Sequence, residues 1–480
     1  MFYSSVDVED QRRSNDLREA REVWTREINE GRFDPAVKFR RGRKAGPGML
    51  LLVLAVILVS CRSKERVTLS FLNPEWAQPD EAPRAQEVAE RFTKQTNIGV
   101  RYLPVPESSS GQLEISRRLL REHASVPDLL AIDVVWPGAL ADDLVDLRPY
   151  LANEIAALDP KLVAAFTVGG RVVAIPYHAQ IGVLAYRADL LRKYGFDRPP
   201  RTWTELEHMA ARIQTGERAA GRKDFWGYVW QGAEAEPLTC NALEWQVAEG
   251  GGQIIEADGT ISVNNPAAIR SWERARHWIG WISPPGVIAY RELDSLNLFD
   301  SGLAAFRRTW LWRYRLTHEQ SLLQPQNLGY AGMPGGPGGR TGTLGGIGLA
   351  ISRYSVHRQE AIELVRFLIR EELRSRDEDT STTTPEHFDL PALLEPHGRF
   401  DEPGASTVVS RPSAIAGPSY EKVTKVYYDA VHSVLTGEIP APQAAADLEK
   451  QLTQITGFKS GPPKERPVVS SFQDRRAVTH

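Results

Sequence analysis

The stretch GGRVVAIPYHAQIGVLAYRADLLRKYGFDRPPRTWTELEHMAARI, residues 169–213, decides the fold class of this chain. The glycine pair at its start predicts a tight turn. Two apolar runs, 172–175 and 181–186, predict buried strands, and the segment 188–194 has helical spacing. Strands that alternate with helices over such short distances predict an α/β domain.

The end of this stretch predicts a second helix. Pro199 and Pro200 interrupt regular structure, and Thr202 follows shortly after them. Thr202 and Glu205 have the spacing of a capping box, in which a hydroxyl and a carboxylate satisfy the first backbone N–H groups of a helix. We therefore predict that a helix begins at Thr202, and we assign this pair a structural role only.

The same alternation is present upstream. Apolar patterns predict strands at 67–72, 100–105 and 128–135, and helices at 81–95 and 111–123 lie between them. The third strand is almost continuously apolar, which is typical of a buried parallel strand. In open α/β sheets, ligands bind beyond the carboxyl ends of the strands.

Polar and aromatic residues follow two of these predicted strands. Glu75 and Trp76 come just after the first strand, and Asp133 and Trp136 stand at the end of the third. Because these are the sheet positions at which ligands bind, all four are candidate ligand-binding residues.

A short apolar run near the N-terminus predicts export. Residues 49–59 read MLLLVLAVILV, basic residues precede them, and Ser60 and Cys61 follow. This order is typical of a secretory signal peptide, and the run is shorter than the roughly 20 residues that span a bilayer. Residues 58–61 resemble the lipobox of bacterial lipoproteins, which implies that Cys61 is lipidated and becomes the new N-terminus. The alternative is a single membrane anchor with a cytoplasmic head of residues 1–40.

The ends of the chain lie outside the predicted fold. A signal peptide should start a chain, so we predict that residues 1–39 are a non-native or disordered extension and that 40–61 form the lipoprotein signal peptide. Val37 is a candidate for the true start of translation. Residues 459–480 are predicted to be a disordered tail.

Composition limits the class of protein. The chain has 480 residues, of which 42% are hydrophobic, enough for two or more domains or lobes. A net charge of −3 gives no indication of a nucleic-acid partner. Lipidation of Cys61 would leave Cys240 without a disulfide partner, and the scattered histidines do not form a zinc motif. We predict no metal and no cofactor.

The stretch 169–213 resembles the central signature of the family 1 extracellular solute-binding proteins, the maltose- and trehalose/maltose-type receptors of ABC importers. Within it, Pro-Tyr, Tyr-Arg, Pro-Pro, Thr-Trp and Glu-Leu pairs match the family pattern in order. The blocks 127–151, 299–312, 330–352 and 411–452 resemble later parts of that pattern. The resemblance covers about residues 67–456, which is nearly the whole of the predicted mature chain.

The resemblance implies a two-lobed α/β periplasmic-binding-protein fold, type II-like, with a ligand cleft and an interlobe hinge. The N-terminal lobe would comprise 67–177 and 344–402, and the C-terminal lobe 178–343 and 403–458. The implied function is that of a receptor and not an enzyme. A monomer, lipid-anchored on the periplasmic or extracellular face, would bind a di- or oligosaccharide of the trehalose or maltose type and deliver it to ABC permease subunits.

Sugar binding requires aromatic faces for stacking and polar groups for directional hydrogen bonds. Each candidate also has a structural alternative: aromatic residues in the core, a strand-end cap for Asp133, a hinge turn for Gly346 and an interlobe salt bridge for Arg411. Gln180 stands near a position where many trehalose/maltose-type members have an acid. With the four residues above, the candidate set is Glu75, Trp76, Asp133, Trp136, His178, Gln180, Tyr290, Trp310, Gly346 and Arg411.

Two alternative functions remain open at this stage. A protein of the same fold could bind a non-sugar ligand such as a polyol phosphate, a polyamine or a peptide. A secreted glycoside hydrolase would need two carboxyl groups about 5 to 9.5 Å apart, for which Asp133 and Glu75 are the available pair. The surroundings of that pair do not resemble a hydrolase motif.

Overall fold

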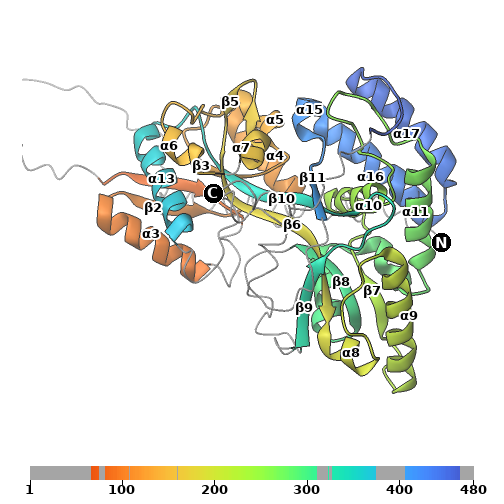
Figure 1. Ribbon diagram of the computed structural model, residues 1–480. Helices are drawn as coiled ribbons and strands as arrows, with labels where there is room; N and C mark the ends of the chain where they lie inside the picture. The colour runs from red at the N-terminus through yellow and green to blue at the C-terminus, as the bar shows by residue number, and fades with distance from the viewer. Residues whose placement is uncertain are drawn as a thin grey trace, which may run out of the picture. The chain divides into compact units, whose positions relative to one another are not determined.

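The computed structural model describes residues 66–74, 82–106, 109–158, 160–310, 323, 327–374 and 406–464 (Figure 1). The chain divides into two compact units. The smaller unit draws on residues 1–132, 142–145 and 349–368, and the larger unit draws on 133–141, 146–348 and 369–480. The predicted lobe boundaries stay a prediction.

The smaller unit contains the predicted βαβαβ segment. Strands β1 (Thr68–Leu72), β2 (Gly99–Leu103) and β3 (Leu129–Asp133) run parallel in the order β2-β1-β3. Helices α3 (Ala82–Thr96) and α4 (Ser109–Arg121) connect them. The predicted positions of all five elements are therefore confirmed to within a few residues.

Asp128 anchors the start of β3 within this unit. Its buried carboxylate accepts hydrogen bonds from the backbone N–H and the hydroxyl of Ser70, at 2.8 and 2.7 Å. The hydroxyl of Ser355 donates a third, at 2.6 Å. Charge-assisted bonds of this kind are stronger than neutral ones, so they fix the strand that ends at Asp133.

Strand β6 (Ile175–Arg187) is central to the larger unit. It runs antiparallel to β8 (Ala304–Trp310) and β9 (Leu328–Gly332), and β8 pairs in parallel with β7 (Trp226–Val229). Strands β8 and β9 lie on opposite sides of β6, because residues 183–186 pair with both. Strand β10 (Arg340–Ile351) is also a neighbour of β6, and it pairs in parallel with β11 (Ser406–Val409).

The predicted strand at 181–186 is confirmed as part of β6, but the prediction of a separate strand at 172–175 is wrong. The first short strand, β5 (Arg171–Val172), pairs with β4 (Thr167–Val168), and a bend follows it. From Ile175 onward the chain forms one continuous strand, because Pro176 lies at its start, where a missing backbone N–H is tolerated.

Helix α10 (Glu236–Ala248) is the most buried helix of the larger unit, and it carries the free, buried Cys240. An aromatic core lies around it, in which Trp278 packs against Trp203 and Trp245 at ring-centroid distances of 5.3 and 5.6 Å. The other helices and turns of this unit are α5 (Pro137–Leu140), α6 (Ala152–Ala156), α7 (Pro160–Ala165), α8 (Ala188–Lys193), α9 (Trp203–Ala219), α11 (Pro266–Trp278), η3 (Pro285–Ala289), α12 (Glu292–Asp300), α15 (Ser413–Ala416), η7 (Gly417–Ser419), α16 (Tyr420–Thr436) and α17 (Ala441–Thr456). Two elements belong to the smaller unit wholly or in part, η2 (Ala141–Asp143) and α13 (Arg358–Arg374).

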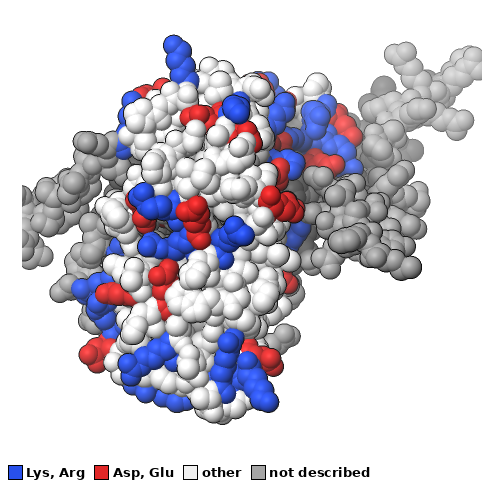
Figure 2. Space-filling model, turned by 90° about the vertical axis from the view of Figure 1, so that its right-hand side faces the viewer, with Lys and Arg blue, Asp and Glu red and all other residues white. Residues whose placement is uncertain are grey.

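The face of the larger unit formed by α9, α11 and α17 carries charges of both signs, interspersed with wide neutral areas (Figure 2). Many of these charges are paired: Glu249 binds Arg270 at 3.3 Å and Arg274 at 3.0 Å. Such a mixed surface, like the small net charge, gives no indication of nucleic-acid binding.

The predicted helix start at Thr202 is confirmed. The Thr202 hydroxyl accepts the Glu205 backbone N–H at 3.2 Å, and α9 begins at Trp203. The Glu205 carboxylate accepts two hydrogen bonds from Arg198, both at 2.9 Å, and one from the Arg201 backbone N–H at 2.7 Å. The Arg198 guanidinium is the largest cause that lowers the pKa of Glu205 to about 2.

This low pKa predicts a pH-dependent contribution to stability. Because the pKa of Glu205 in the folded state lies below its ordinary 4.5, the contribution is present above pH 4.5 and is lost as the pH falls toward 2. The carboxylate is 34% exposed, so we expect only about 1 kcal/mol. Glu205→Gln should therefore lower the free energy of unfolding by this amount at pH 7 and by only about a quarter of it at pH 2.5, as measured by urea titration. An equal loss at both pH values would contradict the prediction.

The described structure continues past α17 into residues predicted to be a disordered tail. The Ile261 backbone N–H donates to the Lys459 carbonyl at 2.9 Å, and the Gly461 N–H donates to the Ile261 carbonyl at 3.0 Å. Lys464 then pairs with Asp258 at 2.9 Å. Residues 459–464 thus pack on the larger unit, and 465–480 lie outside the described residues.

The predicted signal peptide and Cys61 also lie outside the described residues. Within the part of the chain that is described, no helix is long and apolar enough to cross a membrane.

Candidate ligand-binding site

Asp133 ends strand β3 and leaves 29% of its side chain exposed. Its Oδ1 accepts the Val135 backbone N–H at 3.1 Å, and the Nη2 of Arg411 is 3.5 Å away. Burial raises the pKa of Asp133, Arg411 opposes that effect, and the carboxylates of Glu236 and Glu292 add to it. Asp133 thus faces one cation, Arg411, at 3.5 Å, and two other carboxylates.

Arg411 is held rigidly next to Asp133. Its side chain is 3% exposed, Nη1 donates to Glu236 Oε1 at 2.8 Å, and Nη2 donates to the Leu344 carbonyl at 3.2 Å. Burial opposes ionisation, but the surrounding negative groups outweigh it and raise the pKa of Arg411, so the guanidinium stays charged. Its Nε is buried and has no hydrogen-bond partner among the described residues.

Glu236 fixes Arg411 from the first turn of α10. The same carboxylate accepts hydrogen bonds from the Tyr420 hydroxyl and, at 2.7 Å, from the Thr424 hydroxyl. These residues lie on α16, so one carboxylate joins two helices to the arginine. A guanidinium fixed in this way keeps its planar fork in one orientation.

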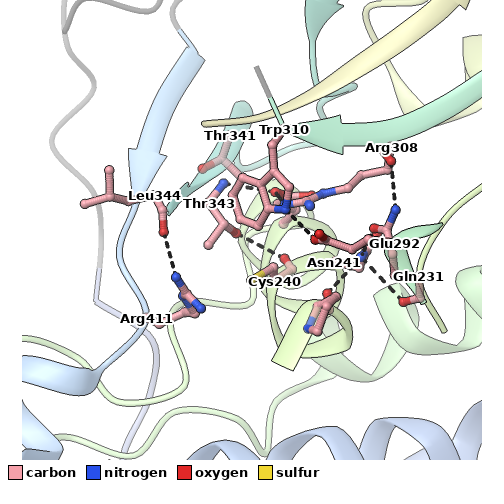
Figure 3. A network of polar contacts seen from close by, with 12 residues as sticks. Gln231, Cys240, Asn241, Glu292, Arg308, Trp310, Thr341, Thr343, Leu344 and Arg411 are labelled. Carbon is pink, nitrogen blue, oxygen red and sulfur yellow. Dashed lines mark hydrogen bonds and ion pairs between the residues drawn. The ribbon is translucent and has the colours of Figure 1, made fainter. Parts of the chain in front are cut away.

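Trp310 ends strand β8 and is held at its edge and on one face (Figure 3). Its indole N–H donates to Glu292 Oε1 at 2.5 Å, and the guanidinium carbon of Arg308 lies 3.9 Å from the ring centroid. The ring is partly exposed. Because Arg308 covers part of the ring, a ligand can contact only the part of the indole that remains exposed.

Gly345 allows β10 to approach this ring. A Cβ at position 345 would lie 2.8 Å from Cζ3 of Trp310 and 3.2 Å from each of Cε3 and Cη2. Such nearly equal distances put the Cβ above the ring plane and not beside its edge. Since Leu344 contacts Arg411 and Gly345 contacts Trp310, adjacent residues of β10 join the two parts of the candidate site.

Gly346, the next residue, has a structural reason to be glycine. Its φ is +129°, and a Cβ there would lie 2.2 Å from the His178 carbonyl oxygen. Its own carbonyl accepts the Val134 backbone N–H at 3.0 Å, directly after Asp133. His178 is itself buried and stacks on Tyr177 with ring centroids 4.0 Å apart.

The remaining candidates are less clearly part of this group. Trp136 is 5% exposed, which favours the core alternative. Gln180 lies half-buried in β6, and Tyr290 is half-buried at the end of η3, where burial raises its pKa. Glu75 and Trp76 lie outside the described residues.

The structure thus brings together Asp133, Trp310, Gly346 and Arg411, and it adds three residues that the sequence analysis missed: Glu236, Glu292 and Arg308. Glu292 comes two residues after Tyr290, and Arg308 stands two residues before Trp310 on the same strand face. The two-residue spacing of Arg308 and Trp310 is a signal that sequence reasoning could have used. Glu236 has no comparable signal, because it is 175 positions from Arg411.

The comparison with protein families agrees with this geometry. The family model for the bacterial extracellular solute-binding protein matches residues 77–374. The chain belongs to this family. Family membership implies a location outside the cytoplasm.

A probable ABC transporter-binding protein of Deinococcus radiodurans is 36% identical over 416 residues, which cover 85% of this chain and 98% of the relative. The maltose-bound MalE3 structure of T. maritima matches with a TM-score of 0.71 and 29% identity, over 81% of this chain and all of that chain. A solute-binding protein of Agrobacterium radiobacter K84 in complex with ribitol shares the fold, with a TM-score of 0.64 and 22% identity over 82% of this chain and 98% of that chain.

These likenesses confirm three predictions. The fold is the two-lobed α/β fold of this family. The chain is a solute-binding protein of an ABC transporter. It is a binding protein and not an enzyme, so the glycoside hydrolase alternative is no longer supported.

Proposed function

We propose that this protein is a monomeric, lipid-anchored receptor that binds a neutral di- or oligosaccharide of the maltose or trehalose type and delivers it to the permease of an ABC importer. Asp133, Arg411 and Trp310 would make the main contacts with the sugar. Ligand binding would shift the population toward the conformation that the permease recognises.

One observation carries the proposal: a fixed donor and a partly exposed acceptor lie 3.5 Å apart, and the adjacent residues Leu344 and Gly345 connect them to a partly exposed aromatic ring. A sugar hydroxyl both donates and accepts hydrogen bonds. Arg411 can donate to it while Asp133 accepts from it or from its neighbour, and a C–H group can contact the part of Trp310 that remains exposed. The 29% identity with a maltose-bound protein supports the same class of ligand.

A ligand that carries an amine is the second candidate, and the distribution of charge favours it. Arg308 is paired with Glu244 at 2.7 Å and Arg411 with Glu236 at 2.8 Å. Asp133 then shares Arg411 with Glu236, at 3.5 Å, and no described lysine or arginine is paired with Glu292. These two carboxylates disfavour a phosphorylated ligand and would suit a polyamine or an amino sugar.

A thermal-shift screen of the purified protein distinguishes these ligands. A ligand that binds only the folded state raises the unfolding midpoint by mass action. We expect a shift with maltose or trehalose, and none with amino acids or sugar phosphates. A shift with spermidine or glucosamine alone would overturn the neutral-sugar assignment and retain the receptor. A shift with none of these compounds would contradict the proposed ligand class.

The lipid anchor has its own prediction. If Cys61 carries the lipid, Cys61→Ser should abolish incorporation of radiolabelled palmitate and release the protein from membranes into the soluble fraction, because a lipidated N-terminus is the proposed means of attachment. Cys240→Ser is the matched control, and it should leave labelling and fractionation unchanged. Persistent membrane association of the Cys61 variant without label would favour the apolar segment 49–59 as an uncleaved anchor.

A further inference from the structure

A fully buried ion pair lies directly beneath the candidate aromatic contact. Arg308 and Glu244 are both 0% exposed, and Glu244 accepts two hydrogen bonds from the guanidinium, at 2.7 and 3.1 Å. Glu244 also accepts the Thr343 backbone N–H at 3.0 Å. Removing two charges from water costs so much free energy that a buried pair is weak evidence for a role in stability.

The position of the guanidinium indicates another role. Arg308 is fixed by Glu244 on one side, and its carbon lies 3.9 Å from the centre of the Trp310 ring. A cation over an indole face is attracted by the ring quadrupole, and more strongly where water is excluded. With the Glu292 contact at the indole N–H, both the tilt and the rotation of Trp310 are determined.

Strands β6 and β10 pass so close to the ion pair and the ring that only glycine fits at the points of contact. A Cβ at Gly182 would lie 1.9 Å from Oε1 of Glu244 and 2.7 Å from Nη2 of Arg308. Gly345 is under a similar restriction from Trp310. Gly182 of β6 therefore lies against the ion pair, and Gly345 of β10 lies against the indole ring. A larger residue at either position would displace the pair or the ring.

We propose that the Arg308–Glu244 pair is a positioning pair that holds Trp310 in the orientation required for ligand contact. This rests on the proposed function, because it assumes that Trp310 contacts the ligand. Arg308 and Glu244 are buried, so they act through the indole and do not touch the ligand themselves.

The test replaces the pair without leaving a buried charge. In R308M/E244M, two apolar side chains of similar volume take the place of the ions, and such replacements often preserve stability. We expect a thermal midpoint close to that of the wild type, at least tenfold weaker binding of maltose by calorimetry, and a displaced or broadened 19F resonance of Trp310 in protein labelled with 5-fluorotryptophan. The resonance is assigned by its absence in W310F.

A second variant guards against misfolding. R308K keeps the charge beside Glu244 but loses the planar group that stacks on the ring, so we expect at least fivefold weaker binding and the same change in resonance. The control R187M/D189M removes another ion pair, 2.6 Å long, from the larger unit and should change neither property.

The outcomes separate the two proposals. Wild-type affinity and an unchanged Trp310 resonance in either folded variant would overturn the positioning role. If the wild type binds no saccharide, the proposed function fails, while the 19F resonance still decides whether the pair orients Trp310.

Discussion

Arg411→Lys is expected to weaken saccharide binding by roughly 10- to 100-fold. Lysine keeps the charge but replaces a planar fork with a single ammonium group, and Arg411 uses its two Nη atoms in different directions. An ammonium drawn toward Glu236 cannot also face Asp133. Losing one charge-assisted hydrogen bond to the ligand costs about 1.5–3 kcal/mol, which corresponds to this range of affinity.

Calorimetric titration with the saccharide found by the thermal-shift screen measures this effect. Arg187→Lys is the matched control, because Arg187 is also buried and also binds a carboxylate, Asp189, through two nitrogens at 2.8 and 2.6 Å. Both variants should lose similar stability, but only the Arg411 variant should lose affinity. Equal affinities in the two variants would show that Arg411 is a structural ion-pair residue, the alternative that the sequence left open.

Local sequence patterns predicted the parts of this fold that depend on short-range structure. The strand ending at Asp133 and the helix beginning after Thr202 follow from apolar periodicity and from a hydroxyl at a cap position. The continuous strand β6 was not predicted, because Pro176 appears in the sequence as an interruption. In the structure this proline is the second residue of the strand and does not interrupt it.

The candidate site was predicted only in part, for a physical reason. Asp133 and Trp310 stand at strand ends, which the sequence locates, but the groups that orient them come from distant segments. Glu236 and Glu292 contact Arg411 and Trp310 across 175 and 18 positions. No periodicity links such residues, since their proximity depends on the tertiary fold.

The same limit applies to charge. The sequence places Asp133 and Arg411 among the candidates but does not show which charges are paired. The structure shows that Glu244 neutralises Arg308 in the core, so this cation is not available to a ligand. Glu292, which the sequence analysis missed, adds a carboxylate at Trp310, and this is why the thermal-shift screen includes amines.

Gly346→Ala is expected to destabilise the protein by about 3–5 kcal/mol. Two effects add: a non-glycine residue at φ +129° is strained by about 1–3 kcal/mol, and the new methyl group collides with the His178 carbonyl oxygen at 2.2 Å. The neighbouring atoms belong to the backbone of β6, which pairs with β10 and cannot move aside cheaply. Urea unfolding, read as the change in midpoint at constant slope, measures the loss.

Gly339→Ala separates strain from collision. Gly339 also has a positive φ, +89°, but nothing lies within 4 Å of a Cβ at that position, so its replacement should cost only about 1 kcal/mol. A large difference between the two variants assigns Gly346 to the close approach of β10 and β6, directly beside Asp133. If Gly346→Ala loses no more stability than Gly339→Ala, the structure around position 346 can accommodate a methyl group. That result would contradict the structural reason given for glycine at this position.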